Sequence, residues 1–277
     1  MIRMKRTLLI VLVTVAALIL LTAALAWADE HAALVSVGHG IPGTDLGLDE
    51  ALPVDVIVDD DCAVQDLAFG EFAGPLELEA STAYSVAVAL SDGDDETCDG
   101  DVVLGPVSLT FEAGDNATVF AHLTADGQPG PADVDVLGLG ITASVFDNDV
   151  SSVVAGHTRL TVRHTAWAPA VDVFLNRGWI RGRAIAEIEG LEHPDEAGPV
   201  DLRPGAYAVS ILETGAEEDA EPIFQVPATQ GDGPFVTHPH RSQIVYAVGS
   251  LENETFTLVV QSINLGHMPP PRPALPE

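Results

Sequence analysis

The sequence predicts an all-β protein, built from two tandem antiparallel β-sandwich domains of the immunoglobulin-like type. Three observations predict this fold. Short runs alternate apolar and polar residues, clusters of turn-forming residues separate the runs, and the two halves of the chain repeat each other. Alternation with a period of two places one face of a strand on a core and the other in water. Many short strands with turns between them are typical of a sandwich.

The N-terminal residues 1–28 predict a signal peptide. Three basic residues precede an almost wholly apolar run over residues 8–26, and an Ala-Trp-Ala sequence then gives the small-x-small pattern of a cleavage site. We expect the mature chain to begin at Asp29 and to be secreted, either extracellular or periplasmic. The apolar run is close to membrane-spanning length, so an uncleaved N-terminal anchor is the alternative.

The charge distribution predicts a domain boundary near residue 152. Residues 29–150 contain 26 Asp and Glu and no Lys or Arg, whereas residues 151–277 contain 16 acidic residues and 8 Arg. We therefore expect a strongly acidic first domain over 29–152 and a second domain over 153–266. The C-terminal segment 267–277 is rich in proline and is expected to be disordered.

The two expected domains resemble copies of one another, since four segments recur in the same order with similar spacing. A duplication is the simplest cause. The paired segments are Ala33–His39 with Leu160–His164, Leu52–Val58 with Ala168–Phe174, Gly74–Val86 with Gly198–Val209, and Ala117–His122 with Gln243–Val248.

Strands are expected wherever apolar alternation is clear. Turn-forming clusters such as Gly43–Asp45 and Glu252–Asn253 separate them. The stretch Ile185–Leu191 is open between a turn of helix and an irregular strand. The expected strands are 53–58, 76–80 and 84–90 in the first half, and 160–162, 171–174, 207–212, 244–248 and 256–260 in the second.

Composition excludes several classes of function. A formal net charge of -31 argues against a nucleic-acid binder and against attraction to an anionic membrane. The expected partner is instead an unidentified protein or a cell-surface glycan. A glycan site would use exposed aromatic side chains, for which Trp167 and Trp179 are the candidates after the signal peptide. Trp167 could equally pack at the junction of the two domains.

Cys62 and Cys98 are the only cysteines, and both lie in the first expected domain. Each stands beside an acidic loop at the end of an expected strand, and an exported chain reaches a compartment where disulfides persist. The sequence therefore predicts a Cys62–Cys98 disulfide, with two free thiols as the alternative.

Two acidic clusters in the first half are candidates for calcium, because calcium favours several carboxylate oxygens on a flexible loop. The longer cluster lacks the glutamate that an EF-hand loop has at its twelfth position. We therefore expect a solvated acidic surface and no cofactor, with calcium as the alternative. The candidate ligands are Asp59, Asp60, Asp61, Asp92, Asp94, Asp95, Asp99 and Asp101.

Segment 38–43 matches the pattern GxGxxG, which in dinucleotide-binding proteins holds a pyrophosphate at a helix N-terminus. Pro42 and an acidic stretch follow where a helix is required. We expect a plain turn without cofactor binding.

Histidines form two further candidate sites. His39 and His164 occupy matching places in the repeats, and the expected structure is a half-buried side chain bonded to backbone, with a functional pair as the alternative. His238 and His240 could bind a metal together with His193. On a polar loop we expect them to be exposed instead.

Three segments of the second half resemble the pattern of a known family, namely Arg163–Val173, Leu202–Val209 and Ile244–Glu252, and Val37–Pro42 with Ala121–Gly127 form a paired upstream copy. On these segments the chain is similar to the family of domain of unknown function 4397. Trp167 and the longer segment 184–197 depart from the family pattern. The resemblance implies secreted or surface-exposed bacterial β-sandwich domains, and it implies no reaction, ligand or catalytic residue.

The sequence thus predicts a non-enzymatic, secreted or cell-surface protein with an interaction or structural role. It contains no HExxH, CxxC, GxSxG or P-loop motif, and no catalytic residue is expected. The alternatives are a secreted hydrolase, whose carboxylate pair could not be recognised among so many acidic residues, and a calcium-stabilised adhesin.

Overall fold

The computed structural model describes residues 32–91, 93, 97–177, 184–217, 220–226, 234–265 and 267–268. The described chain is all-β, with one short 3-10 helix, η1 (Gly43–Leu46). No helix in this described part is long and apolar enough to cross a membrane. Several predictions concern residues outside the described ranges, namely the signal peptide 1–28, Asp92, Asp94, Asp95, Trp179 and the segment 269–277.

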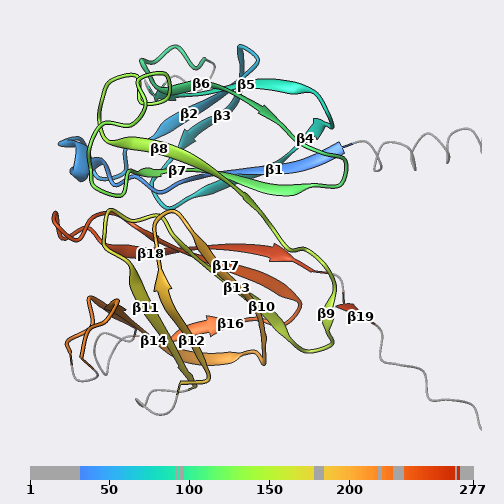
Figure 1. Cartoon of the computed structure of the whole chain (residues 1–277). Coiled ribbons are helices and arrows are strands. Elements are labelled where there is room, and N and C mark those ends of the chain that lie inside the picture. Colours follow the sequence, from blue (N-terminus) through green and yellow to red (C-terminus); the bar gives the residue numbers. More distant parts are fainter. Residues whose placement is uncertain are drawn as a thin grey trace, which may run out of the picture.

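The first half of the chain forms two four-stranded sheets (Figure 1). The sheet that faces the second half, here called the first inner sheet, has the order β4-β1-β7-β8. The first outer sheet has the order β3-β2-β5-β6. The strands are β1 (Ala32–His39), β2 (Val54–Val58), β3 (Asp61–Leu67), β4 (Phe72–Glu79), β5 (Ala83–Leu90), β6 (Val102–Thr110), β7 (Asn116–Leu123) and β8 (Ile141–Asp147).

The second half repeats this arrangement. Its inner sheet has the order β13-β10-β17-β18, and its outer sheet has the order β12-β11-β14-β15, with β16 also paired to β14. A short parallel pair joins β9 (Val153–Val154) to β19 (His267–Met268), at the start of the segment predicted as a tail. The other strands are β10 (Thr158–His164), β11 (Val171–Arg177), β12 (Ala186–Leu191), β13 (Glu196–Leu202), β14 (Gly205–Glu213), β15 (Phe224–Val226), β16 (Phe235–Thr237), β17 (Arg241–Val248) and β18 (Thr257–Asn264).

Strand pairing agrees between the halves in detail. Within the described residues, both outer sheets are antiparallel throughout, as predicted. Each inner sheet contains one parallel pair, β1 with β7 and β10 with β17, so the prediction of purely antiparallel sheets was wrong there. These paired strands are far apart in sequence and are not joined by a hairpin, so nothing forces them to be antiparallel. The register also shifts at the same point, between Val35 and Val37 and between Leu160 and Val162.

Two local predictions are settled by the described strands. The ambiguous stretch 185–191 forms β12, in which Ala186 and Ile188 pack against the core while Glu187 and Glu189 are exposed. The burial of its side chains therefore follows the period of two of a strand and not the period of a helical turn. The predicted turn at Gly43–Asp45 is part of η1.

The four sheets stack face to face, with the two inner sheets in contact at the centre (Figure 1). A main core fills the space between the inner and outer sheets of each half, and the first half has a second, smaller cluster around Val35 and Phe111. A further core joins the inner sheets, where the ring of Phe120 stacks on that of Tyr246 with centroids 4.1 Å apart. Both faces of the inner sheets are thus covered, and every residue of β10 is buried.

Candidate functional site

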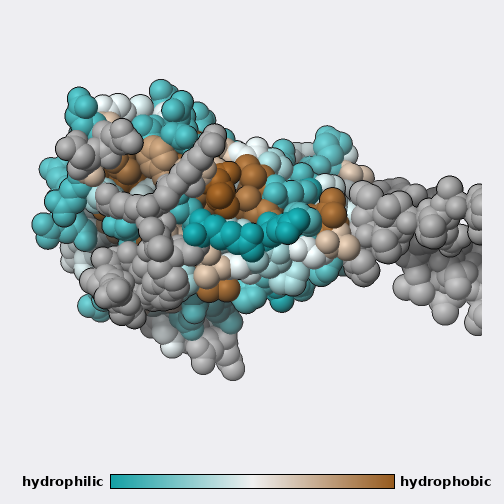
Figure 2. Space-filling view, turned by 90° about the horizontal axis from the view of Figure 1, so that it is seen from below, coloured by the Kyte–Doolittle hydropathy of each residue, from teal (hydrophilic) through white to brown (hydrophobic). Residues whose placement is uncertain are grey.

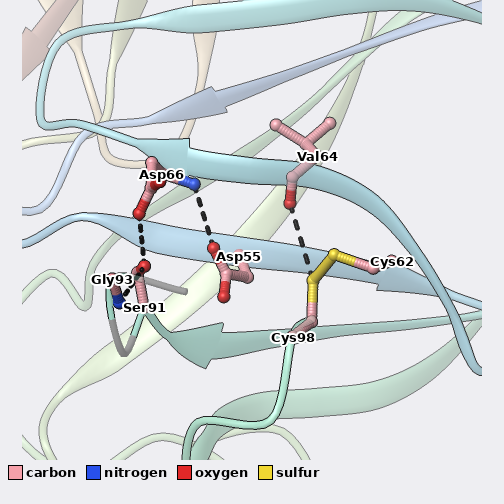
Figure 3. The surroundings of a disulfide bond; sticks show 7 residues. All are labelled: Asp55, Cys62, Val64, Asp66, Ser91, Gly93 and Cys98. Carbon is pink, nitrogen blue, oxygen red and sulfur yellow. Dashed lines mark hydrogen bonds between the residues drawn. A yellow bond between two sulfur atoms is a disulfide. The ribbon is translucent and has the colours of Figure 1, made fainter. Parts of the chain in front are cut away.

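The structure contains the predicted disulfide between Cys62 and Cys98 (Figure 3). Cys62 lies near the start of β3, and Cys98 lies in the loop before β6, with Cα atoms 5.5 Å apart. The bond therefore ties the β5–β6 loop to the edge strand of the first outer sheet.

The described calcium candidates lie around this disulfide but do not converge. Asp59, Asp60 and Asp61 are exposed at the turn between β2 and β3, and Asp99 and Asp101 are exposed before β6. No group of three or more His, Cys, Asp or Glu side chains in the described ranges is placed to hold a metal ion. The expectation of a solvated acidic surface fits these five positions.

Sequence reasoning missed a buried carboxylate beside the same loop. The side chain of Asp55 in β2 is only 1% exposed. Its Oδ1 accepts a 2.9 Å hydrogen bond from the backbone N–H of Asp66, while its Oδ2 has no hydrogen-bond partner. The hydroxyl of Ser91 donates to the carboxylate of Asp66 (Figure 3). The repeat gave the available signal, because Asp172 stands at the matching place in the second half.

His39 and His164 are bonded to backbone, as expected, although both are fully buried rather than half-buried. Each lies 2.9 Å through Nε2 from a carbonyl oxygen, that of Leu52 for His39 and that of Pro169 for His164. Burial lowers the pKa of His39 to about 4 and also lowers that of His164. Both rings fill matching places at the ends of β1 and β10.

His193 meets two histidines that the sequence did not group with it. Its Nε2 lies 3.2 Å from Nδ1 of His122, and its ring centroid lies 6.1 Å from that of His164. Burial lowers the pKa of His122 to about 3, and neighbouring His193 acts in the same direction. His193, in the connection between β12 and β13, thus faces β7 of the first half. His238 is exposed, as expected, whereas His240 is partly buried.

The GxGxxG segment is the close-packed end of β1 and its connection to η1, where a plain turn was predicted. A Cβ on Gly38 would lie 2.6 Å from the Phe120 ring, and one on Gly40 would lie 2.4 Å from it. The segment leads into η1, which is too short to present a helix N-terminus. Glycine is required here by packing against the central core.

Trp167 lies at the junction of the two halves, where it lines an open groove of about 490 Å³. Gly127 of the first half packs on its indole, since a Cβ there would lie 2.5 Å from the ring. Exposed Asp126, Gln128 and Glu252 also line the groove. An aromatic surface thus stands beside carboxylate and amide groups, on loops contributed by both halves.

Asp135 shapes the β7–β8 loop on the groove's first-half side. It is 2% exposed and accepts hydrogen bonds from the backbone N–H groups of Gly130, Leu139, Gly140 and Ile141. Burial acts to raise the pKa of Asp135, but these four donors outweigh it and lower the pKa. The loop is therefore held by an ionised carboxylate at its centre.

Comparisons with known proteins add a family but no activity. No curated protein matches the chain. Among solved structures, the chain is similar to the Bacillus anthracis TIE protein, with 9% identity, 80% of this chain and 50% of that chain covered, and a TM-score of 0.21. It is also similar to a proposed cell adhesion protein from Bacteroides ovatus, with 11% identity, 85% and 99% coverage, and a TM-score of 0.20. The chain thus spans half the length of the Bacillus anthracis protein.

The family comparison gives a single match over residues 33–174. It begins in β1, covers the whole first half and ends in β11, so it crosses the boundary predicted near residue 152. The match spans more than half of the chain. The chain belongs to the family described as domain of unknown function (DUF4397).

Proposed function

We propose that this protein is a secreted or cell-surface module of two tandem immunoglobulin-like sandwiches, with a non-enzymatic role in binding or in building the cell surface. The matching strand orders and register shifts of the two halves support a tandem duplication. The disulfide is compatible with an extracellular location.

The groove around Trp167 carries the proposal. Loops from both halves form it, and loops on a rigid sandwich are a common place for binding residues. An indole face beside amide and carboxylate groups suits a sugar ring, whose C–H face stacks on the aromatic and whose hydroxyls bond the polar groups. We therefore infer a cell-surface glycan, or a protein side chain of similar character, as the partner.

Exposed apolar side chains support a role in surface contact. Val200, Val236 and Ile185 of the second half are between 36% and 49% exposed. Figure 2 shows the lower face of the molecule, where hydrophobic residues gather near the middle of a largely hydrophilic surface. Such a mixed face is suited to contact with another molecule.

The test compares binding of the intact secreted protein and its Trp167→Ala variant to arrays of cell-surface glycans and to whole bacterial cells. We expect saturable binding by the wild type and its loss in the variant, with Tyr84→Ala as an aromatic control, since Tyr84 is partly exposed on β5 of the first outer sheet. Trp167→Phe should retain part of the binding, which separates recognition from simple loosening of the junction. Turnover of chromogenic glycoside, ester or peptide substrates would contradict the proposal and favour the hydrolase.

A further inference from the structure

Asp55 and Asp172 occupy equivalent positions in the two outer sheets. Asp55 follows Val54, which pairs with the last residue of β5, and Asp172 follows Val171, which pairs with the last residue of β14. Each aspartate therefore lies beside the residue that directly follows its partner strand. That residue is Ser91 in the first half and Thr214 in the second.

In the second half, protein donors satisfy this carboxylate. Asp172 accepts hydrogen bonds from the N–H of Gly190 at 2.7 Å, the hydroxyl of Thr214 at 2.9 Å and the N–H of Gly215 at 3.4 Å. Burial acts to raise the pKa of Asp172, and these donors outweigh it and lower the pKa. The aspartate thus stays ionised and closes the turn.

In the first half, the same place holds more negative charge and fewer donors. Asp66 replaces Gly190, with φ of 52° against 65°. Its N–H is the one donor to Asp55, whose Oδ2 is buried without a partner. Ser91, which replaces Thr214, donates to Asp66 instead. This position of the outer sheet therefore has two carboxylates in the first half, those of Asp55 and Asp66, and one in the second half, that of Asp172.

Among the residues that the structure describes, no cation compensates this charge. Residues 29–150 contain no Lys or Arg, and none of the ion pairs found among the described residues reaches Asp55 or Asp66. A buried carboxylate oxygen without a donor or a cation costs free energy, which a bound metal ion would remove. Calcium takes carboxylate, hydroxyl and water oxygens in a flexible geometry, whereas magnesium requires a stricter octahedron.

We propose that Asp55, Asp66 and Ser91 form a calcium site in the first outer sheet, with water completing the coordination (Figure 3). Asp55 lies beneath the surface and Asp66 is exposed, so the ion has a path from solvent. The site holds two carboxylates and a hydroxyl, and it therefore binds weakly, with a dissociation constant of roughly 10⁻⁴ to 10⁻³ M, as in other extracellular modules. It is independent of the proposed function at the Trp167 groove.

The test is calorimetric titration of calcium chloride into the metal-free full chain at fixed ionic strength, with magnesium chloride in parallel. We expect one saturable, calcium-selective site. Asp66→Gly, which copies the second half, should weaken binding at least about tenfold, and Asp66→Asn should do the same. Glu112→Gln is the matched control, since it removes one exposed acidic charge of the first half elsewhere, and it should bind as the wild type does.

Folding is checked by melting each variant without calcium. Glycine suits the positive φ at position 66, so the melting temperature of Asp66→Gly should be unchanged or higher. Equal responses to calcium and magnesium would show charge screening alone and overturn the proposal. Selective binding that survives Asp66→Gly but is lost on replacing Asp60 and Asp61 by Asn would place the ion in the β2–β3 turn, and would overturn it as well.

Discussion

Arg163 donates a 2.6 Å hydrogen bond to the hydroxyl of Tyr246 in the layer where the two inner sheets meet. The arginine is 1% exposed, and its guanidinium carbon lies 4.4 Å from the ring centroid of Phe146 in the first half. It also donates to the backbone carbonyl of Asp147 and to the carboxylate of Glu196. One cation of the second half thus bonds across the junction to the end of β8.

Replacing Arg163 should therefore loosen the junction. Arg163→Met keeps much of the apolar stem but leaves Tyr246 and Asn148 without their donor, and we expect a loss of roughly 2–4 kcal/mol in the free energy of unfolding. Arg163→Lys should cost less, because it keeps the positive charge. It should still cost something, because an ammonium group lacks the planar fork with which arginine donates to several partners. Urea unfolding of both variants measures this, with Arg203→Met at an exposed position as control. Equal stability of Arg163→Met and Arg203→Met would contradict the prediction.

The stacking of the inner sheets explains where sequence reasoning succeeded and failed. Strands β2 and β5 belong to outer sheets, and their alternation predicted them closely. In β10 and β17 nearly every residue is buried. Polar residues of β10 such as Thr161 and Arg163 therefore look like solvent-facing positions, although they lie on the face that meets the other inner sheet. An alternating sequence cannot distinguish a strand face that is exposed to solvent from a polar strand face that is buried between two sheets.

The candidate sites were predictable only where the signal was local. The Cys62–Cys98 disulfide was predictable because these are the only two cysteines and because the expected signal peptide implied an oxidising compartment. His122 and His193 are 71 residues apart, and no spacing rule joins them. The surroundings of Asp55 depend on Asp66 and Ser91, which come from other strand ends and meet only in the folded sheet.

Acid should destabilise the protein through its buried histidines. His122 has a folded pKa of about 3 and His39 of about 4, both below the usual 6.5, because burial disfavours the charged ring. The unfolded chain therefore takes up protons first as pH falls. The stabilisation is fully present above pH 6.5 and is lost as pH falls from there toward 4 and 3, at about 1.4 kcal/mol per pH unit for each histidine.

The measurement is urea unfolding at pH 7.0 and 5.5. This window lies above the titration range of Asp135, Asp149 and Asp172, whose pKa values are lowered. His122→Gln should reduce the pH dependence by the share of one histidine, although its own stability at pH 7.0 is lower. Stability that is flat or rises on going to pH 5.5 would mean that relief of carboxylate repulsion outweighs the histidines.

Reduction should destabilise the first half. The Cys62–Cys98 bond closes a separation of 36 residues, which in the chain-entropy model stabilises the fold by roughly 3–4 kcal/mol. Cys62→Ser with Cys98→Ser should lower the free energy of unfolding by about that amount. Thiol titration of the unfolded, unreduced wild type checks the bond itself, and two reactive thiols per chain would refute it.

Salt should stabilise the intact chain, because the first half carries 26 acidic residues over 29–150 and no basic residue of its own. Sodium chloride shortens the Debye length from about 30 Å at 0.01 M to about 3 Å at 1 M, which screens this repulsion. Melting is best measured on the full chain, since separate halves would expose Phe120 and Tyr246. Potassium chloride should give the same rise in melting temperature.

Arg159→Gln supplies an internal check. Arg159 bonds Asp149 at 2.8 Å and so brings a positive charge of the second half to the end of the first half. Its loss should cost more at 0.01 M than at 1 M salt, because the variant carries one more net negative charge and salt screens the added repulsion. A melting temperature that does not change between these concentrations, in the wild type and in Arg159→Gln alike, would show that the acidic surface is too widely spaced to strain the fold.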